Sequence, residues 1–265
     1  MTAVESGTAR ILARKEGATG WLTFNNPERR NAVSVDMWEA IPRVLGAFHA
    51  DPEVRVIVLT GAGDKAFVSG ADISQFEKER GTEDAVRRYE RIGDAAQRAL
   101  LEAEKPVIAM IRGFCIGGGL NVANACDLRI ASDDSRFAIP AGKMGLGYRA
   151  SSMKLLVDAV GPAYAREIML TARQFTAAEA KEMGLVHKVT SKESLETTVR
   201  EYCDMIAANA PLTLRAAKKI IREVSRAPYD EAACAALVKA CMESEDYKEG
   251  RRAFMEKRKP VFKGR

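Results

Sequence analysis

Apolar runs alternate with amphipathic stretches along the first half of the chain. Four short apolar runs have the length and composition of strands, and they cover residues 20–26, 54–63, 105–114 and 126–132. Two of them, 54–63 and 105–114, are almost wholly apolar, as expected for strands of a parallel sheet that is covered on both faces. Between the strands, periodic patterns predict helices, which cover residues 34–51, 82–104 and 120–125. This alternation predicts stacked βαβ units.

A proline interrupts the first of these helical patterns. Ser34 precedes the pattern and has the side chain of a helix N-cap. Pro42 lies inside it and lacks the backbone N–H that a helix interior uses. We therefore expect the helix over residues 34–51 to be kinked or shortened at Pro42.

After residue 150 the chain changes to consecutive helical patterns. They cover residues 151–160, 162–172, 176–184, 194–209, 213–224 and 230–244. The sequence contains neither a low-complexity linker nor an internal repeat. We therefore expect an α/β core over residues 1–190, followed by a helical C-terminal section over residues 191–265.

The composition is that of a soluble globular protein. The chain has 265 residues, of which 47% are hydrophobic and 29% charged, enough for one large domain with or without a small appendage. No apolar stretch approaches the roughly 20 residues of a membrane span. The first residues also lack the apolar core of a secretory signal, so we expect a cytoplasmic protein without a membrane span.

Cysteine and histidine usage argues against several kinds of site. The five cysteines are odd in number and form no CxxC pair, which favours reduced, mostly buried thiols over a disulfide framework or a zinc site. We expect no bound metal. The two histidines, His49 and His187, fall at a predicted helix end and in a predicted strand. A Ser-His-Asp or Cys-His mechanism needs a positioned imidazole as base. With only two histidines in the chain, such a mechanism is not favoured.

The net charge of +5 is concentrated at the end of the chain. Residues 248–265 carry eight basic side chains against two acidic ones. Such a tail can face an anionic ligand or can be a solvated chain end. The sequence has no basic stripe interleaved with aromatic residues of the kind that stacks bases, so we do not expect a nucleic-acid partner.

Three consecutive glycines stand between an apolar run and a helical pattern in CIGGGLNVAN (115–124). A helix N-terminus with glycines can approach an anionic oxygen closely, or the glycines can serve a tight packing turn. Neither the phosphate-loop pattern GxxxxGK[ST] nor the dinucleotide pattern GxGxxG is present. A second turn, Ser69-Gly70-Ala71-Asp72, also follows a predicted parallel strand. Two such turns at one sheet edge can aim two N–H groups at one oxygen and form an oxyanion hole.

Six segments together resemble the crotonase, or enoyl-CoA hydratase/isomerase, superfamily. They are NNPERRNAVSVDM, FVSGADI, RGFCIGGGLNVANACDLRIAS, RFAIPAGKMGLG, TAAEAKEMGLVHKV and FMEKRKPVF, and they occur in the family's order over nearly the whole chain. The resemblance implies an α/β fold with a spiral of ββα turns and a helical C-terminal trimerisation section. It further implies a homotrimer or a hexamer, and acyl-CoA substrates whose coenzyme A belongs to the substrate, with no separate cofactor.

The resemblance also implies roles for individual residues. The N–H groups that hold the thioester oxygen, as it becomes an enolate, fall on Ala71 and Gly118. Coenzyme A contacts fall on Arg30, Ala32, Ala71, Asp72, Ile73, Phe254 and Lys257. The first two would lie along the pantetheine and phosphates, the next three would present backbone to the adenine, and the last two would often come from a neighbouring subunit. For Asp72, a helix cap is an alternative role.

The chain departs from the family pattern where hydratases carry two glutamates, because those positions are Asn121 and Ala141. Neither side chain can exchange a proton, so we expect a poor hydratase of simple enoyl-CoA substrates. Farther along, Tyr148 could donate a proton to an enolate, and Arg149 could hold a carboxylate or form an ordinary salt bridge. The alternatives are a decarboxylase, a carbon–carbon lyase or hydrolase of a carboxylated acyl-CoA, and a non-catalytic member that binds acyl-CoA or RNA.

Overall fold

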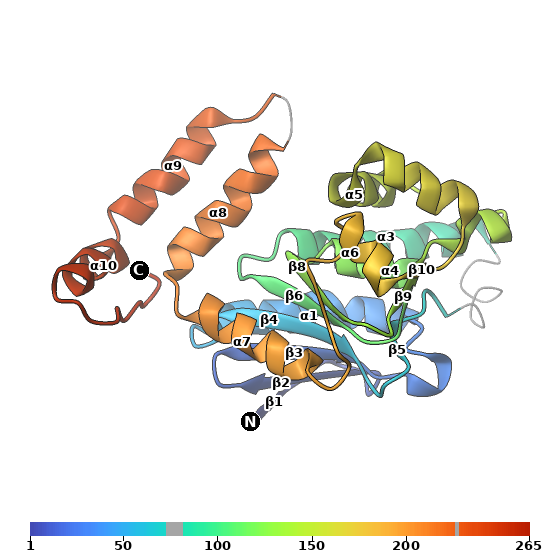
Figure 1. The fold of residues 1–265 in the computed structure, drawn as a ribbon, viewed down its shortest axis with the longest axis horizontal. Helices are drawn as coiled ribbons and strands as arrows, with labels where there is room; N and C mark the ends of the chain where they lie inside the picture. The colour runs from blue at the N-terminus through green and yellow to red at the C-terminus, as the bar shows by residue number, and fades with distance from the viewer. Residues whose placement is uncertain (73–81, 226–227) are drawn as a thin grey trace.

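Two β-sheets form the centre of the computed structural model, which describes residues 1–72, 82–225 and 228–265 (Figure 1). Within these residues the larger sheet has seven strands and the smaller has four. The larger sheet follows the order β1 (Thr2–Val4), β2 (Ile11–Glu16), β3 (Thr19–Phe24), β4 (Val56–Gly61), β6 (Val107–Ile111), β8 (Leu128–Ser132) and β11 (Lys188–Thr190). The smaller sheet follows the order β10 (Phe175–Thr176), β9 (Arg136–Ala138), β7 (Phe114–Ile116) and β5 (Ala66–Val68).

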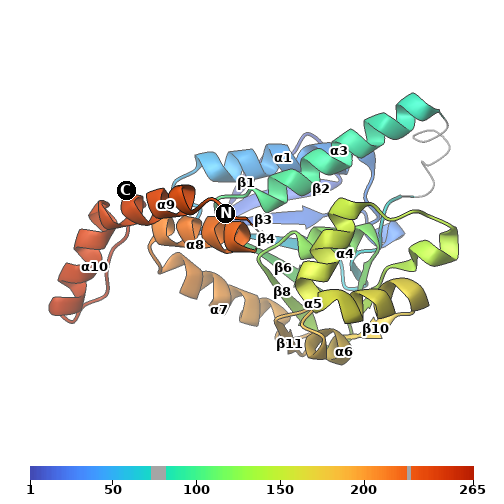
Figure 2. The ribbon, with the colours of Figure 1, turned by 90° about the horizontal axis from the view of Figure 1, so that it is seen from above.

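Helices cover both faces of the larger sheet, as Figure 2 shows. Strands β3, β4, β6, β8 and β11 run parallel, and their alternate residues point to opposite faces. On one face Val58 and Ile108 pack in a cluster with α7 (Leu195–Ala207). On the other face Ile57 belongs to the main core, together with α1 (Val35–Ala50) and α3 (Glu83–Leu101). Every residue of β4 is therefore buried, which confirms the strand predicted from the apolar run.

The single strand predicted over residues 105–114 is wrong, because the chain changes sheets there. Strand β6 ends at Ile111 in the larger sheet, and β7 begins at Phe114 in the smaller one. Gly113 lies between them with φ +63°, and a Cβ built on it would lie 2.1 Å from the carbonyl oxygen of Lys65. Only glycine permits this backbone conformation and this close approach.

Pro42 does not shorten α1, contrary to one of the two outcomes expected from the sequence. The helix continues to Ala50, and its apolar face lies in the core on both sides of the proline. That face consists of Met37, Ile41, Val44, Leu45 and Phe48, all fully buried. Burial of these side chains offsets the backbone hydrogen bond that proline cannot make.

The remaining helices agree with the periodic patterns to within a few residues, except α10, for which the sequence predicted no separate helix. They are α4 (Gly118–Asn124), α5 (Ala150–Thr171), α6 (Ala177–Glu182), α8 (Pro211–Val224), α9 (Glu231–Met242) and α10 (Glu245–Met255), with short 3-10 turns η1 (Pro27–Arg29) and η3 (Pro140–Met144). Helix α5 is interrupted at Gly161, where φ is +72° and ψ 168°, so it consists of two helical segments, as predicted over 151–160 and 162–172. Among the described helices, none is long and apolar enough to cross a membrane.

Helices α8, α9 and α10 form an arm that extends from the core (Figures 1 and 2). Two basic side chains of α8 contact the core. Lys218 forms a salt bridge with Asp127 at 2.6 Å, and Arg222 donates a hydrogen bond to the carbonyl oxygen of Leu101 at 2.7 Å. Helix α9 has no buried residue, and large apolar side chains are exposed along the arm. They include Ile221, Val224, Val238, Met242, Phe254 and Met255.

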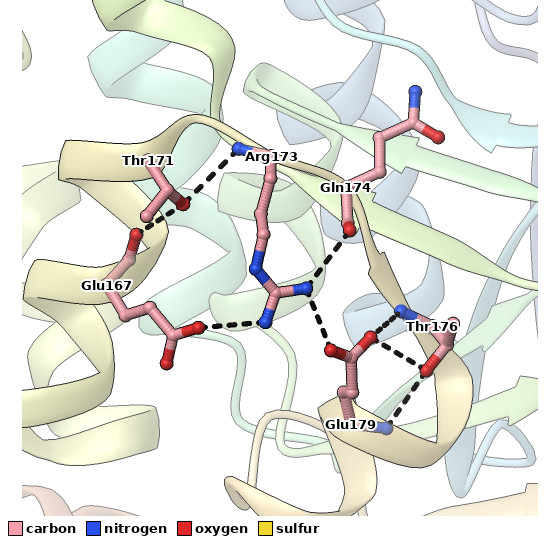
Figure 3. A network of polar contacts seen from close by, with 6 residues as sticks. All are labelled: Glu167, Thr171, Arg173, Gln174, Thr176 and Glu179. Atoms are coloured by element: carbon pink, nitrogen blue, oxygen red, sulfur yellow. Dashed lines mark hydrogen bonds and ion pairs between the residues drawn. The ribbon is translucent and has the colours of Figure 1, made fainter.

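A polar network joins the end of α5 to the start of α6 (Figure 3). The Arg173 guanidinium lies between Glu167 and Glu179, with each nearest N–O distance 2.8 Å. Thr176 and Glu179 form a capping box at the N-terminus of α6. The backbone N–H of Thr176, then Arg173 and the Thr176 hydroxyl, lower the pKa of Glu179 from 4.5 to about 2.

We predict that Glu179→Gln lowers the free energy of unfolding at pH 7 by ~0.5–1 kcal/mol, because Gln keeps the capping-box acceptor but loses the negative charge that interacts with Arg173 and with the N-terminus of α6. The folded-state pKa of Glu179 lies below its unfolded value, so its stabilisation is present above pH 4.5 and is lost as pH falls towards 2. Urea denaturation at fixed protein concentration should therefore show a difference between variant and parent that disappears in acid. Glu182→Gln, an exposed change on the same helix, is the control. An equal effect of both changes would contradict the assignment.

Candidate functional site

The glycine loop ends strand β7 and begins helix α4. Gly117 has φ +55° and ψ −113°, and its N–H donates to the carbonyl oxygen of Ala138 at 2.8 Å. Gly119 packs against β5 so closely that a Cβ built on it would lie 2.1 Å from the carbonyl oxygen of Val68. Gly118, between them, is the first residue of α4, so its N–H has no acceptor within the helix. Two of the glycines thus shape the turn and its packing, and the third offers an N–H.

The second turn places Ala71 beside Gly118. A parallel β-bridge joins Val33 to Ala71. The N–H of Val33 donates to the carbonyl oxygen of Gly70 at 2.9 Å, and the N–H of Asp72 donates to the carbonyl oxygen of Val33 at 3.0 Å. Because N–H groups alternate in direction along an extended chain, the N–H of Ala71 points away from Val33. A Cβ built on Gly118 would lie 3.7 Å from the Ala71 nitrogen.

These two N–H groups converge without an acceptor. Within the part of the chain that the structure describes, neither Ala71 nor Gly118 donates a backbone hydrogen bond through its nitrogen. Both residues are half-buried and line the same cavity, so their N–H groups can donate to an oxygen that carries negative charge. This arrangement fits the predicted oxyanion hole.

A cavity of about 320 Å³ opens beside the two N–H groups. Its wall is mainly apolar and is formed by the two turns, α3, α4, η3 and the start of α5. Helix α3 contributes a stripe at three- and four-residue spacing: Val86, Tyr89, Glu90, Gly93, Gln97 and Leu100. Glu90 is the one carboxylate among the described residues that line the cavity.

Sequence reasoning missed this contribution of α3. The sequence shows that these residues share one face of a helix. It does not show whether that face lines a cavity or packs on the core, because both kinds of face have the same composition. Its use as a cavity wall depends on how α3 lies over α4. Ser152 at the start of α5 was missed for the same reason.

A hydrogen-bonded chain occupies the position where hydratases of the family carry a glutamate. The Tyr148 hydroxyl donates to Oδ1 of Asn121 at 2.5 Å, and Nδ2 of Asn121 donates to Oγ of Ser152 at 3.1 Å. Burial raises the pKa of Tyr148 above its ordinary value of 10, and the hydrogen bond to Asn121 only partly opposes this. Tyr148 therefore keeps its proton at neutral pH.

The second glutamate position and the following arginine lie at the same cavity. Ala141 is 5% exposed and contributes only a methyl group to the wall. Arg149 also lines the cavity, and its guanidinium pairs with Asp94 of α3 at 2.6 Å. The structure thus brings all five predicted catalytic positions to one cavity: Ala71, Gly118, Asn121, Tyr148 and Arg149. Arg149 already has a carboxylate partner there.

The positions predicted to contact coenzyme A are less closely grouped. Ala32 is buried, and the exposed Arg30 guanidinium lies 5.0 Å from the centre of the Phe114 ring. Asp72 is 7% exposed and pairs with Arg29 at 2.9 Å. Ile73 lies outside the described residues.

The last two predicted contacts lie in the arm. Phe254 is in α10 and 83% exposed, and Lys257 follows that helix. Figure 1 shows α10 at the opposite end of the molecule from α4. The structure of one chain therefore does not bring these two residues to the cavity. No cluster of three potential metal ligands occurs among the residues described.

Comparison with known proteins identifies the family of the chain. The family model described as enoyl-CoA hydratase/isomerase matches residues 14–265. The chain is 36% identical to the short-chain-enoyl-CoA hydratase of Clostridium acetobutylicum over 251 residues, 94% of this chain and 95% of that protein. It is 35% identical to the peroxisomal Delta(3,5)-Delta(2,4)-dienoyl-CoA isomerase of Arabidopsis thaliana over 276 aligned residues, 99% of each chain.

A solved structure is also similar along the whole chain. The crystal structure of a putative enoyl-CoA hydratase/isomerase family protein from Hyphomonas neptunium superposes with a TM-score of 0.94 at 40% identity, covering 98% of this chain and all of that one. The family model, the relatives and the fold therefore show that this chain is an enzyme of the enoyl-CoA hydratase/isomerase family, within the crotonase superfamily.

Proposed function

We propose that this enzyme acts on an acyl-CoA by forming a thioester enolate, whose oxygen is held between the N–H groups of Ala71 and Gly118. The observation that carries this proposal is the convergence of two unpaired backbone donors at the mouth of an apolar cavity. Such donors stabilise charge that develops on the oxygen, and each contributes about 3–4 kcal/mol in measured cases. The mainly apolar wall suits an acyl chain.

We further propose that the enzyme is a poor hydratase of simple straight-chain enoyl-CoA. Addition of water needs one group to take a proton from water and another to deliver a proton to the α carbon. Asn121 is held between two hydroxyl groups, and Ala141 has no ionisable group. The Clostridium relative is named a hydratase, so under this proposal the two proteins differ in hydratase activity.

Tyr148 is the proposed proton donor to the enolate. It lines the cavity with Gly118 and keeps its proton at neutral pH because burial raises its pKa. A neutral phenol can donate to a developing carbanion without first taking a proton from elsewhere. Solvent would restore the proton after each turnover.

A second candidate is decarboxylation, or cleavage of a carbon–carbon bond, in a carboxylated acyl-CoA. Loss of carbon dioxide leaves the electron pair of the broken bond on the α carbon and forms the enolate without a base. This suits a cavity in which Asn121 and Ala141 replace both glutamates. Arg149 would have to share its guanidinium between the substrate carboxylate and Asp94. Release of carbon dioxide from methylmalonyl-CoA would favour this candidate.

We also propose that the chain works as a homotrimer or a hexamer. The arm exposes large apolar side chains, and α9 buries none of its residues. Exposed apolar surface of this kind is typical of an interface. Assembly would also give Phe254 and Lys257 a route to coenzyme A bound by a neighbouring copy.

Gly118→Pro should lower kcat by about 10²–10³-fold, because it deletes one of the two donors. Proline fits the first residue of a helix, so the variant should remain folded. Gly118→Ala, which keeps the N–H and adds a methyl group, is the control and should lose less. Turnover of acyl-CoA substrates and thermal unfolding should be measured together. Unchanged turnover in a folded Gly118→Pro protein would rule out the proposed oxyanion hole.

Asn121→Glu combined with Ala141→Glu should raise the hydration of crotonyl-CoA by orders of magnitude. Each acid or base contributes typically 10²–10⁴-fold, so both single variants should gain less than the double variant. Hydration can be followed by the loss of the enoyl absorbance. The proposal fails if the unaltered protein already hydrates crotonyl-CoA with kcat/KM near ~10⁷–10⁸ M⁻¹s⁻¹.

Light scattering should give a mass three or six times that of the 28.9 kDa chain. Val238→Asp places a charge on the exposed face of α9 and should shift the assembly towards smaller species. Leu170→Asp introduces the same charge at a site that is 83% exposed on α5, away from the arm. It serves as the control and should leave the mass unchanged. A monomer at all concentrations of the unaltered protein would overturn the proposed assembly.

A further inference from the structure

The side-chain amide of Asn121 lies between two hydroxyl groups. Tyr148 lies on its Oδ1 side at 2.5 Å, and Ser152 lies on its Nδ2 side at 3.1 Å. Ser152 is 2% exposed, in the first turn of α5, and lines the same cavity. Its neighbour Ser151 is exposed and does not line the cavity. One serine of the pair thus belongs to the site.

The chemistry of the three groups allows two hydrogen-bond arrangements. An amide has one end that donates and one that accepts, whereas a hydroxyl can do both. In the first arrangement Tyr148 donates to Asn121, and Asn121 donates to Ser152. If the amide turns over, Ser152 donates to Asn121, and Asn121 donates to Tyr148. All three groups have a partner in either case.

The two arrangements differ in where the proton of Tyr148 points. In the first it is committed to Asn121, so the tyrosine presents only lone pairs to the cavity. In the second the oxygen of Tyr148 accepts from Asn121, and its O–H is available to another acceptor. An enolate formed beside Gly118 is such an acceptor. Only a residue that can both accept and donate, placed beyond Asn121, supports both arrangements.

We propose that Ser152 is a positioning residue, which allows the Asn121 amide to turn over and thereby directs the hydroxyl of Tyr148 to the substrate enolate. This inference rests on the proposed function, since it needs an enolate in the cavity. Ser152 acts through Asn121, with which it shares a hydrogen bond, and through Asn121 on Tyr148. Without its hydroxyl, one end of the half-buried amide loses its partner in either arrangement, and the arrangement that frees the tyrosine proton loses its donor.

Acetoacetyl-CoA is a suitable probe, because its enolate absorbs in the ultraviolet and can be titrated while bound. A hydrogen bond from Tyr148 stabilises the bound enolate and lowers the pH at which the ligand ionises. We expect Ser152→Ala to weaken enolate binding about tenfold, the size of one lost buried hydrogen bond. Ser152→Thr, which keeps the hydroxyl, should restore most of the effect. Ser151→Ala is the matched control and should behave as the parent.

A double-mutant cycle with Tyr148→Phe separates positioning from a general effect on folding. If Ser152 acts through Tyr148, Ser152→Ala should change nothing further once the tyrosine hydroxyl is absent. The two single variants should therefore show similar losses, and the double variant should show no more than either. This comparison does not depend on Ser152→Thr fitting the buried site.

Two results would overturn the role of Ser152: no change in enolate binding in Ser152→Ala, or an undiminished loss in the Tyr148→Phe background. In both cases the oxyanion hole would stand if Gly118→Pro still weakens enolate binding. Enolate binding that is unaffected by Gly118→Pro would instead contradict the proposed function. Absence of any bound enolate in the unaltered protein would contradict both.

Discussion

The close packing of α4 against the backbone of β5 sets the positions of the two backbone N–H groups at the site. Gly119 allows the helix to approach Val68 to a distance that no side chain would permit. This approach brings the first N–H of α4 next to the turn that follows β5, where Val33 holds Ala71 by a β-bridge. The N–H groups of Ala71 and Gly118 lie close together because β5 and β7 run parallel and end at the same edge of the smaller sheet. A fixed pair of backbone donors needs little reorganisation when charge develops, which is why such a pair is effective in catalysis.

Helix α4 also carries Asn121, at one of the two positions where the family resemblance implies a glutamate in hydratases. One turn after Gly118, Asn121 lines the cavity and is hydrogen-bonded to Tyr148 and Ser152. The relatives of this chain include proteins named as a hydratase and as an isomerase. Under the proposed function, the backbone supplies enolate stabilisation, while a few side chains around the cavity determine how protons move. In this chain those side chains form a neutral hydrogen-bonded group.

Much of this could be predicted from the sequence, because the relevant signals are local. The apolar runs predicted β3, β4 and β8, and the glycine motifs with the family resemblance placed Ala71 and Gly118 together. The change of sheet at Gly113 could not be predicted, since it depends on the approach of Lys65 from a distant segment. The helix continued through Pro42 because burial on both sides of the proline outweighs its lost hydrogen bond. Glu90 and Ser152 were missed because a cavity wall and a core-packing face have the same spacing.

A crystal structure of the protein with bound butyryl-CoA would test the central claim most directly. We expect the thioester oxygen to lie roughly 2.7–3.1 Å from the backbone nitrogens of both Ala71 and Gly118. The acyl chain should extend into the cavity between α3 and α4. A thioester oxygen beyond hydrogen-bond distance of either nitrogen, with the ligand bound elsewhere, would contradict it.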